Sequence, residues 1–320
     1  MTSSASPASS PSRVIIWLSY TAAFLGVCGH ASSEFVVKLT ALAGPEVTVW
    51  RFMLGGLALI IVALLVPSSR DLWTPLKRDF VPIAGLSIFG MTVGQFFFHW
   101  ALDFASVVEV ATLVTTMPIL VVFVAKVVDG TTIGKAKLFS GVGAFLGCVF
   151  LLSDGFANQA NATDSNLIGL LMALGCAVIG AFYLVLIKPY TGQYGAIRMT
   201  TYTFVLGFFA LWPVVGLVWG VWVNPLDLFA RSASEAGAII ALGIWNTCIG
   251  FILWLWGLGN VPDVGRGNYL FFLKPVIATI LAYFILGDHI TWPQLLAVTA
   301  ITGFVMAEIV YGEMRSKAAV

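Results

Sequence analysis

The chain has 320 residues, with 16 basic and 15 acidic side chains that give a formal net charge of +1. Hydrophobic residues make up 59% of the sequence and charged residues only 10%, against about 25% charged in an ordinary soluble domain. A soluble fold of this length could not bury so much apolar surface, so we expect the chain in lipid. The balanced charge also excludes a protein that binds nucleic acid electrostatically.

Ten segments are apolar and long enough to be membrane-spanning helices, each of which needs about 20 mostly apolar residues. They cover residues 14–37, 45–66, 80–103, 106–128, 136–153, 165–187, 199–223, 236–259, 264–286 and 292–311. Residues 1–13 are predicted to form a disordered N-terminus, and residues 313–320 a short tail. The apolar run after Arg13 continues past the point where a signal peptide would be cleaved, so we interpret it as an uncleaved first span.

The positions of Lys and Arg support this count. If the N-terminus is inside, nearly all basic residues between the spans fall on the inner side, and only Lys38 and Arg231 fall outside. Arg51, Lys126 and Lys274 remain within spans. This asymmetry follows the positive-inside bias of membrane proteins. We therefore predict a multi-pass protein of the plasma (bacterial inner) membrane with both termini in the cytoplasm.

The second half of the sequence repeats features of the first. WALDFASVVEVATLVTTMP (100–118) is similar to WGLGNVPDVGRGNYLFFLKP (256–275): each has a tryptophan near the end of one span, a tight turn, and a proline within the next span. Residues 14–155 and 164–312 are therefore predicted to be two repeats of five helices. Because five is odd, the second repeat enters the membrane from the opposite side. We predict an all-α membrane protein with ten transmembrane helices, arranged as two inverted five-helix repeats around a central cavity, which is the geometry of alternating access.

These features resemble the drug/metabolite transporter superfamily, specifically its ten-span EamA type, over essentially the whole chain after residue 13. LFFLKPVIATILAYFILGDHIT (270–291) is similar to the family's ninth-helix signature, with Asp288 in place of the usual glutamate and Lys274 in place of an acid. The resemblance implies a cavity lined by helices 1–4 and 6–9, with helices 5 and 10 at the periphery and near a homodimer contact. Similar members export amino acids and other small metabolites, and some import them.

Charged groups deep in a span mark a pathway, because a central charge costs roughly 2.5–3.5 kcal/mol on the insertion scale. Glu34 and Lys38 lie four residues apart on one helix face, and we interpret them either as a gate or as an interfacial ion pair. Arg51 could bind a carboxylate bidentately or act as a structural clamp. Its match to a family-wide position favours the clamp.

Helix 3 carries the clearest polar stripe in the chain. Gln95, His99 and Asp103 are spaced by four residues and lie on one face, with Trp100 beside them. One interpretation is a cavity wall. The other places His99 and Asp103 at the outer interface, with Trp100 in the aromatic belt.

Prolines within the fourth and ninth helices, Pro118 and Pro275, predict kinks that free a backbone carbonyl for threonines or for cargo. Lys274 could meet a cargo carboxylate or pair with Glu109 or Asp103. The other candidates for the cavity are polar or aromatic residues within spans: Thr112, Thr116, Tyr183, Tyr202, Trp245, Asn246, Asn268 and Tyr269.

The predicted function is secondary transport, most simply export of amino acids or related metabolites, with membrane lipid as surroundings and no cofactor or metal. Import of small organic cations such as quaternary amines is the alternative, because aromatic side chains can bind cations. An intramembrane enzyme or a channel is a different class, but HExxH, GxSxG and filter-like motifs are missing from the sequence. The cysteines, all in apolar runs, are predicted to be buried free thiols: Cys28, Cys148, Cys176 and Cys248.

Overall fold

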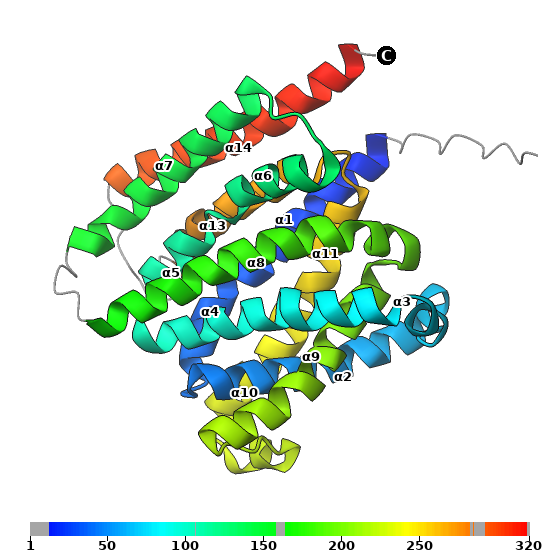
Figure 1. Ribbon diagram of the computed structural model, residues 1–320. Coiled ribbons are helices and arrows are strands. Elements are labelled where there is room, and N and C mark those ends of the chain that lie inside the picture. The colour runs from blue at the N-terminus through cyan, green and yellow to red at the C-terminus, as the bar shows by residue number, and fades with distance from the viewer. Residues whose placement is uncertain (1–12, 106, 158–163, 282–283, 285–291, 319–320) are drawn as a thin grey trace, which may run out of the picture.

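The computed structural model describes residues 13–105, 107–157, 164–281, 284 and 292–318, and these form only helices and turns (Figure 1). The helices of the first half are α1 (Arg13–Leu39), α2 (Gly44–Leu65), α3 (Thr74–Gly85), α4 (Val93–Phe104), α5 (Val107–Val114), α6 (Met117–Asp129) and α7 (Lys135–Ala157). Those of the second half are α8 (Asp164–Tyr194), α9 (Ala196–Trp219), α10 (Ala233–Ala241), α11 (Gly250–Asn260), α12 (Val264–Asn268), α13 (Lys274–Leu281) and α14 (Trp292–Ala318). The all-α fold that the sequence predicts is confirmed.

Six helices in the described part of the chain are long and apolar enough to cross a membrane: Arg13–Leu39, Gly44–Leu65, Thr74–Phe104, Leu167–Tyr194, Ala196–Trp219 and Ala233–Asn260. They correspond to predicted spans 1, 2, 3, 6, 7 and 8. The other four predicted spans fall on α5 with α6, on α7, on α12 with α13, and on α14. In each of these four spans the helix is interrupted, or it contains residues whose side chains the structure does not describe.

Both halves contain the same interruptions at equivalent places. A π-helical segment, η2 (Leu86–Thr92), joins α3 to α4, and a second one, η4 (Leu242–Ile249), joins α10 to α11. The fourth span breaks between α5 and α6, just before Pro118, and the ninth changes to a 3₁₀ helix, η5 (Tyr269–Leu273), just before α13. A π segment inside a helix is rare and often marks a functional site. Its occurrence in both halves supports the predicted repeat.

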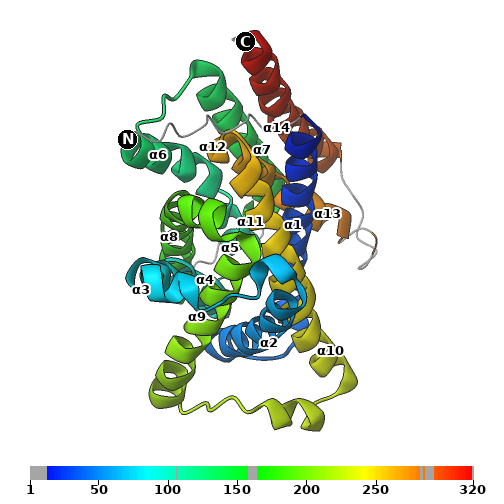
Figure 2. The same cartoon turned by 90° about the vertical axis from the view of Figure 1, so that its right-hand side faces the viewer.

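Helix packing follows the same symmetry. The first span, α1, lies along the eighth span, α11. In the equivalent pair, the sixth span, α8, lies along the third span, α4. Figure 2 shows α1 and α11 side by side. The second and seventh spans, α2 and α9, pack against each other. The central helices therefore come from both halves.

The fifth and tenth spans, α7 and α14, pack side by side at one edge of the bundle (Figures 1 and 2). The Ser140 hydroxyl on α7 donates to the Phe304 carbonyl on α14 at 2.6 Å, and Gly143 and Gly147 give the helices room to approach. Their outer groove is lined by apolar side chains. A homodimer through these helices stays a prediction.

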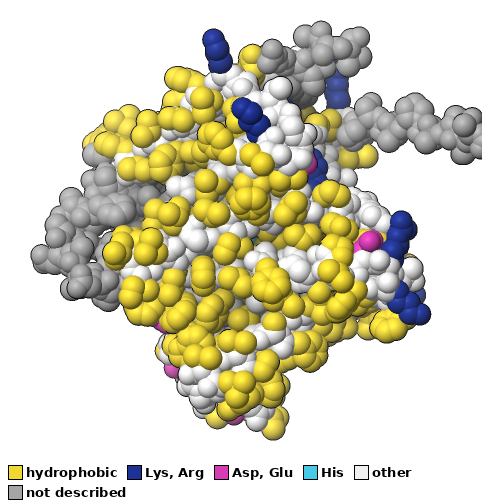
Figure 3. Space-filling view, viewed as in Figure 1, with side chains coloured by type: hydrophobic (Ala, Val, Ile, Leu, Met, Phe, Trp, Pro, Cys, Tyr) yellow, Lys and Arg dark blue, Asp and Glu magenta, His cyan; other side chains and the backbone are white. Residues whose placement is uncertain are grey.

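The outer surface is apolar over most of the face shown in Figure 3. Lys and Arg side chains on that face gather toward the end of the bundle where α1 begins and α14 ends. Large hydrophobic side chains are exposed on most long helices, among them Leu65, Phe89, Phe139 and Leu217. Lipid is the solvent that such a surface requires, and the fold is that of a multi-pass membrane protein.

Candidate functional site

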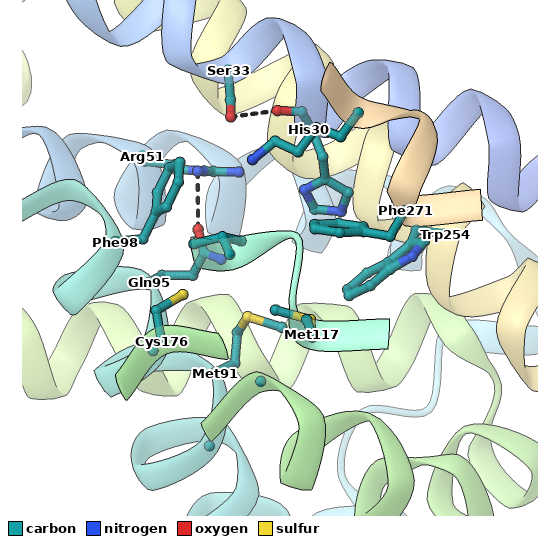
Figure 4. A pocket seen from close by; sticks show the side chains of 15 residues that line it. His30, Ser33, Arg51, Met91, Gln95, Phe98, Met117, Cys176, Trp254 and Phe271 are labelled. Atoms are coloured by element: carbon teal, nitrogen blue, oxygen red, sulfur yellow. Dashed lines mark hydrogen bonds between the residues drawn. The ribbon is translucent and has the colours of Figure 1, made fainter. Parts of the chain in front are cut away.

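A cavity lies at the centre of the bundle, between helices of both halves (Figure 4). Its lining comes from α1, α2, η2, α4, α5, α6, α8, α11, η5 and α13: His30, Ser33, Arg51, Gly90, Met91, Gly94, Gln95, Phe98, Val114, Met117, Cys176, Gly180, Trp254, Phe271 and Lys274. These elements belong to predicted helices 1–4, 6, 8 and 9. Among the described lining residues none comes from α9, the predicted helix 7.

The cavity is narrow. The space not filled by atoms is about 500 Å³, which includes space open to solvent. The centre of a water-sized sphere can move through only about 40 Å³ of it. A small cargo would therefore contact the walls on several sides at once.

Arg51 is the most highly connected polar residue of the cavity. The residue is 1% exposed, and its guanidinium contacts three residues on two elements. The Nε donates to the Thr247 hydroxyl on η4 at 2.9 Å, and Nη1 donates to the Gln95 amide oxygen on α4 at 3.0 Å. The same Nη1 lies 3.0 Å from Nε2 of His99 on α4. Arg51 thus connects α2 to the third span of its own half and to the eighth span of the other half.

His99 is held in one tautomer by these contacts. Arg51 can only donate, so the His99 Nε2 accepts and the ring proton lies on Nδ1. The Nδ1 is 3.0 Å from the Thr48 hydroxyl, which in turn donates to the Gly44 carbonyl at 2.7 Å. His99 is therefore neutral and supports Arg51 from behind. A protonated ring would place a donor against the guanidinium.

Lys274 supplies a second cation, from the other half of the chain. Its side chain is 3% exposed, and its Nζ lies 4.9 Å from the ring centroid of Phe98 and 5.5 Å from that of Phe271. Aromatic faces attract an ammonium group electrostatically, and more strongly when water is excluded. The aromatic side chains of the cavity thus already stabilise a resident cation.

His30 lies beside the two cations in an aromatic box. Its ring centroid is 4.5 Å from that of Phe251, 4.7 Å from that of Trp254 and 5.8 Å from that of Phe271. Figure 4 shows the ring next to Trp254 and Phe271. The His30 Nε2 is buried and makes no hydrogen bond to the described residues. It is a polar atom that a cargo or a water molecule in the cavity could satisfy.

The opposite wall is apolar and soft. Met91, Met117 and Cys176 lie across the cavity from Arg51 (Figure 4). Glycines of η2 and α8 complete this wall, and a Cβ on Gly180 would lie 2.6 Å from the Met117 methyl group. Methionine side chains adapt their shape to what they contact. The cavity therefore has a cationic, hydrogen-bonding pole and an apolar, adaptable pole.

Asp103, a candidate for a gate or ion pair, instead caps the N-terminus of α2. Both carboxylate oxygens accept from the Gly44 backbone N–H, at 3.0 and 2.9 Å. The N-cap residue Ala43 has no side-chain acceptor, so the cap comes from α4, 59 residues along the chain. A negative charge at a helix N-terminus is favourable. No residue at position 44 other than glycine fits, because a Cβ would overlap the His99 carbonyl oxygen.

We expect Asp103→Ala to lower the melting temperature in detergent, because the loss of a capping side chain costs about 0.5–2 kcal/mol. Asp227→Ala is the matched control, because Asp227 is an exposed acid in the short 3₁₀ helix η3 (Pro225–Ala230) after α9, and it should leave the melting temperature unchanged. Equal melting temperatures for both variants and wild type would show that the Asp103 contact contributes nothing to folding.

Several other candidates lie outside the cavity. The Tyr202 hydroxyl donates to the Leu72 carbonyl at 3.0 Å, and the Tyr269 hydroxyl to the Lys137 carbonyl at 2.5 Å. Trp100 packs edge to face in an aromatic cluster, with its ring centroid 5.1 Å from that of Trp219. These side chains hold the ends and flanks of helices together.

Four more candidates lie near the cavity but do not line it. Tyr183 is buried with its hydroxyl 3.1 Å from that of Thr203, and Thr116 donates to the Leu113 carbonyl in the break between α5 and α6. Trp245 and Asn246 on η4 both donate to the Ser32 hydroxyl of α1, at 3.0 and 2.9 Å.

The remaining candidates are less connected or undescribed. Asn268 is buried in α12, and neither of its amide atoms hydrogen-bonds to a described residue. Lys38 is exposed at the end of α1. The side chains of Glu34, Glu109, Thr112 and Pro275 lie outside the described part of the chain, as do all of Asp288 and His289.

Two threonines of the Arg51 network, Thr48 and Thr247, were not predicted. Threonines within apolar spans usually bond the carbonyl one turn back, as Thr200 does, so their sequence does not distinguish them.

An apolar helical bundle with repeated halves and a central cavity that has a cationic and an apolar pole matches the architecture of a multi-pass membrane transporter. The chain belongs to the EamA-like transporter family, which matches residues 13–153 and again residues 167–307. The double match confirms both the resemblance and the repeat. The family and the names of its relatives place the protein among transporters, not enzymes.

Three relatives illustrate the range of similarity. The chain is 23% identical over 276 residues to an uncharacterized transporter of Archaeoglobus fulgidus (86% of this chain, 91% of the relative). It is 24% identical over 234 residues to the uncharacterized transporter YyaM of Bacillus subtilis (73% and 74%). It is also 24% identical over 215 residues to a probable terminal-alkyne amino-acid exporter of Streptantibioticus cattleyicolor (67% and 68%).

A solved crystal structure has the same fold. It superposes on 93% of this chain and 98% of its own, with a TM-score of 0.75 and 22% sequence identity.

Proposed function

We propose that this transporter exports amino acids, or related small metabolites that carry a carboxylate, across the plasma membrane by alternating access. The observation that carries the proposal is the pairing of Arg51 and Lys274 in one cavity, one from each half of the chain. A carboxylate can accept hydrogen bonds from both cations, and an arginine binds it with a fixed geometry. The name of the relative from Streptantibioticus cattleyicolor supports an amino-acid cargo.

The apolar pole suits the rest of such a cargo. Met91, Met117 and Cys176 would contact an aliphatic side chain while the carboxylate lies against Arg51. His30, with a buried ring nitrogen that has no described protein partner, could accept a hydrogen bond from the cargo's ammonium group. The narrow cavity favours small amino acids over large ones.

The alternative, import of quaternary amines, fits this cavity less well. An organic cation would need an aromatic cage and would be repelled by neighbouring positive charges. Lys274 already lies over Phe98 and Phe271, and Arg51 lies 5.6 Å from the Phe251 ring centroid. The aromatic faces nearest the cavity are thus occupied by resident cations.

The proposed orientation follows from the charges. Lys and Arg side chains gather at the end of the bundle where α1 begins, which the positive-inside bias assigns to the cytoplasm. The inverted repeats give the two faces of the membrane equivalent helix arrangements around the cavity. Opening to one face and then the other would move the cargo.

Counterflow in proteoliposomes tests the proposal, with radiolabelled alanine, valine, leucine, methionine and phenylalanine compared with choline. We expect saturable exchange of one or more aliphatic amino acids. Arg51→Gln and Lys274→Gln should each raise the KM roughly 10- to 100-fold, because a hydrogen bond to a charged group contributes about 1.5–3 kcal/mol.

Lys77→Gln is the control for these charge changes, because Lys77 is exposed on α3 and does not line the cavity. Its KM should equal that of wild type. Exchange of choline but of no amino acid, or an unchanged KM in both cavity variants, would contradict the proposal.

A further inference from the structure

The two π-helical segments contain the same side-chain hydrogen bond. In η2 the Thr92 hydroxyl donates to the Ser87 carbonyl at 2.7 Å, and in η4 the Thr247 hydroxyl donates to the Leu242 carbonyl at 2.8 Å. In both cases the threonine reaches a carbonyl five residues earlier. A π segment displaces the normal helical hydrogen bonds, so the hydroxyl satisfies an acceptor that the backbone leaves available.

Each threonine also packs against a glycine of the other half. Thr247 contacts Gly55 on α2, and Thr92 contacts Gly207 on α9. A Cβ at either glycine would overlap the threonine side chain. The two halves therefore meet at two equivalent points, each made of a glycine on a central helix and a threonine in a π segment.

The two points differ in one respect. The Thr247 oxygen accepts a hydrogen bond from Nε of Arg51. Arg51 lines the cavity and lies four residues before Gly55 on α2. The equivalent stretch of α9, before Gly207, has Thr203 in place of an arginine, and its hydroxyl donates to the Met199 carbonyl in its own helix. Only the point at Thr247 is thus connected to a cation of the cavity.

We propose that Thr247 is the positioning residue that holds Arg51 in its cargo-binding orientation, acting across the interface between the two halves. This inference rests on the proposed function. Thr247 is 0% exposed, and its hydroxyl donates to the Leu242 carbonyl while it accepts from Arg51 Nε. With Nε held by η4 and Nη1 held by α4, the guanidinium plane is fixed where it lines the cavity.

The consequence is that cargo is bound by an arginine of one half whose geometry is set by the other half. When η4 moves relative to α2, the hydrogen bond between Thr247 and Arg51 must break or move with it. The affinity for a carboxylate therefore depends on how the halves are arranged, which is what alternating access requires of a cargo site.

Thr247→Val tests this, because valine keeps the shape and removes the hydroxyl. We expect a KM about 5- to 10-fold above wild type for the amino acid that exchanges fastest in the counterflow panel. Thr92→Val is the matched control: it removes the same intrahelical bond in η2 but no contact with Arg51. Its KM should stay within about 2-fold of wild type, although both variants should lose similar thermal stability. Thr247→Ser should restore the KM.

A double-mutant cycle shows whether Thr247 acts through Arg51. In an Arg51→Gln background, Thr247→Val should change the KM by less than about 2-fold, since coupled residues are not additive. Equal KM changes for Thr92→Val and Thr247→Val, or a full additive effect in the Arg51→Gln background, would overturn the inference. A normal KM in both Arg51→Gln and Lys274→Gln would instead overturn the proposed function, whereas a normal KM in Arg51→Gln alone would overturn this inference.

Discussion

Arg51→Lys is expected to raise the KM for amino-acid exchange almost as much as Arg51→Gln does, although the charge is kept. Arg51 donates from Nε to Thr247 and from Nη1 to Gln95 and His99, so one planar group serves three partners. A lysine ammonium is a point charge on a flexible stem and cannot reproduce the planar fork. The His99 Nε2 and the Gln95 amide oxygen would lose their donor inside a buried site, which costs about 1–3 kcal/mol per group.

Arg70→Lys is the control, because Arg70 is exposed and makes one described hydrogen bond, to the Leu64 carbonyl at 2.8 Å. It should transport like wild type. Exchange at the wild-type rate and KM in Arg51→Lys would show that a positive charge alone is sufficient at this position, and that the hydrogen-bond network around it is dispensable.

Gly257→Val is expected to prevent stable folding. Gly257 on α11 faces α1 so closely that a Cβ would lie 2.6 Å from both the Ala23 nitrogen and the Ser19 carbonyl oxygen. Those atoms are backbone and cannot rotate away, so the two helices must separate. Even the single methyl group of Gly257→Ala should cost about 1–3 kcal/mol, the usual range for overpacking. Small residues are what allow membrane helices to pack closely without a hydrophobic driving force.

Gly85→Ala gives the opposite sign and so serves as the control. Gly85 has helical backbone angles, and a Cβ there would meet no atom within 4 Å. Alanine should stabilise by up to about 1 kcal/mol through helix propensity. Thermal unfolding of purified protein in detergent measures both variants. A melting temperature for Gly257→Ala at or above that of wild type would show that α1 and α11 are not in backbone contact.

The spans and their repetition were predictable because they depend on features visible in one dimension. The length of an apolar run can be counted directly in the sequence. Trp100 corresponds to Trp256 in the other half, and Pro118 corresponds to Pro275. The tight turn between the third and fourth spans, and between the eighth and ninth, follows from the same comparison. None of this requires knowing which way a side chain points.

Helix faces were much harder to predict. A span that is apolar all round carries no stripe that separates the lipid side from the protein side. Tyr202 and Trp245 were therefore predicted to line the cavity, which they do not, whereas His30, which does line it, was not among the candidates. The stripe on helix 3 shows the limit of spacing arguments: Gln95 lines the cavity and His99 lies directly behind Arg51, but Asp103 reaches the end of α2 instead. A π-helical segment also changes which side chains share a face of the helix before and after it, and no residue pattern in this sequence predicts such a segment.

Cysteine protection tests most directly whether the central cavity is where cargo binds. Cys176 is a native thiol in the apolar wall, and a variant with Cys28, Cys148 and Cys248 replaced by serine would leave it as the single reactive group. The rate of its alkylation by N-ethylmaleimide would be measured against the concentration of a transported amino acid. We predict that cargo slows the reaction with a midpoint equal to the transport KM, and that Arg51→Gln shifts this midpoint upward. Alkylation at a rate that saturating cargo does not change, or a thiol that never reacts, would contradict a cargo path through this cavity.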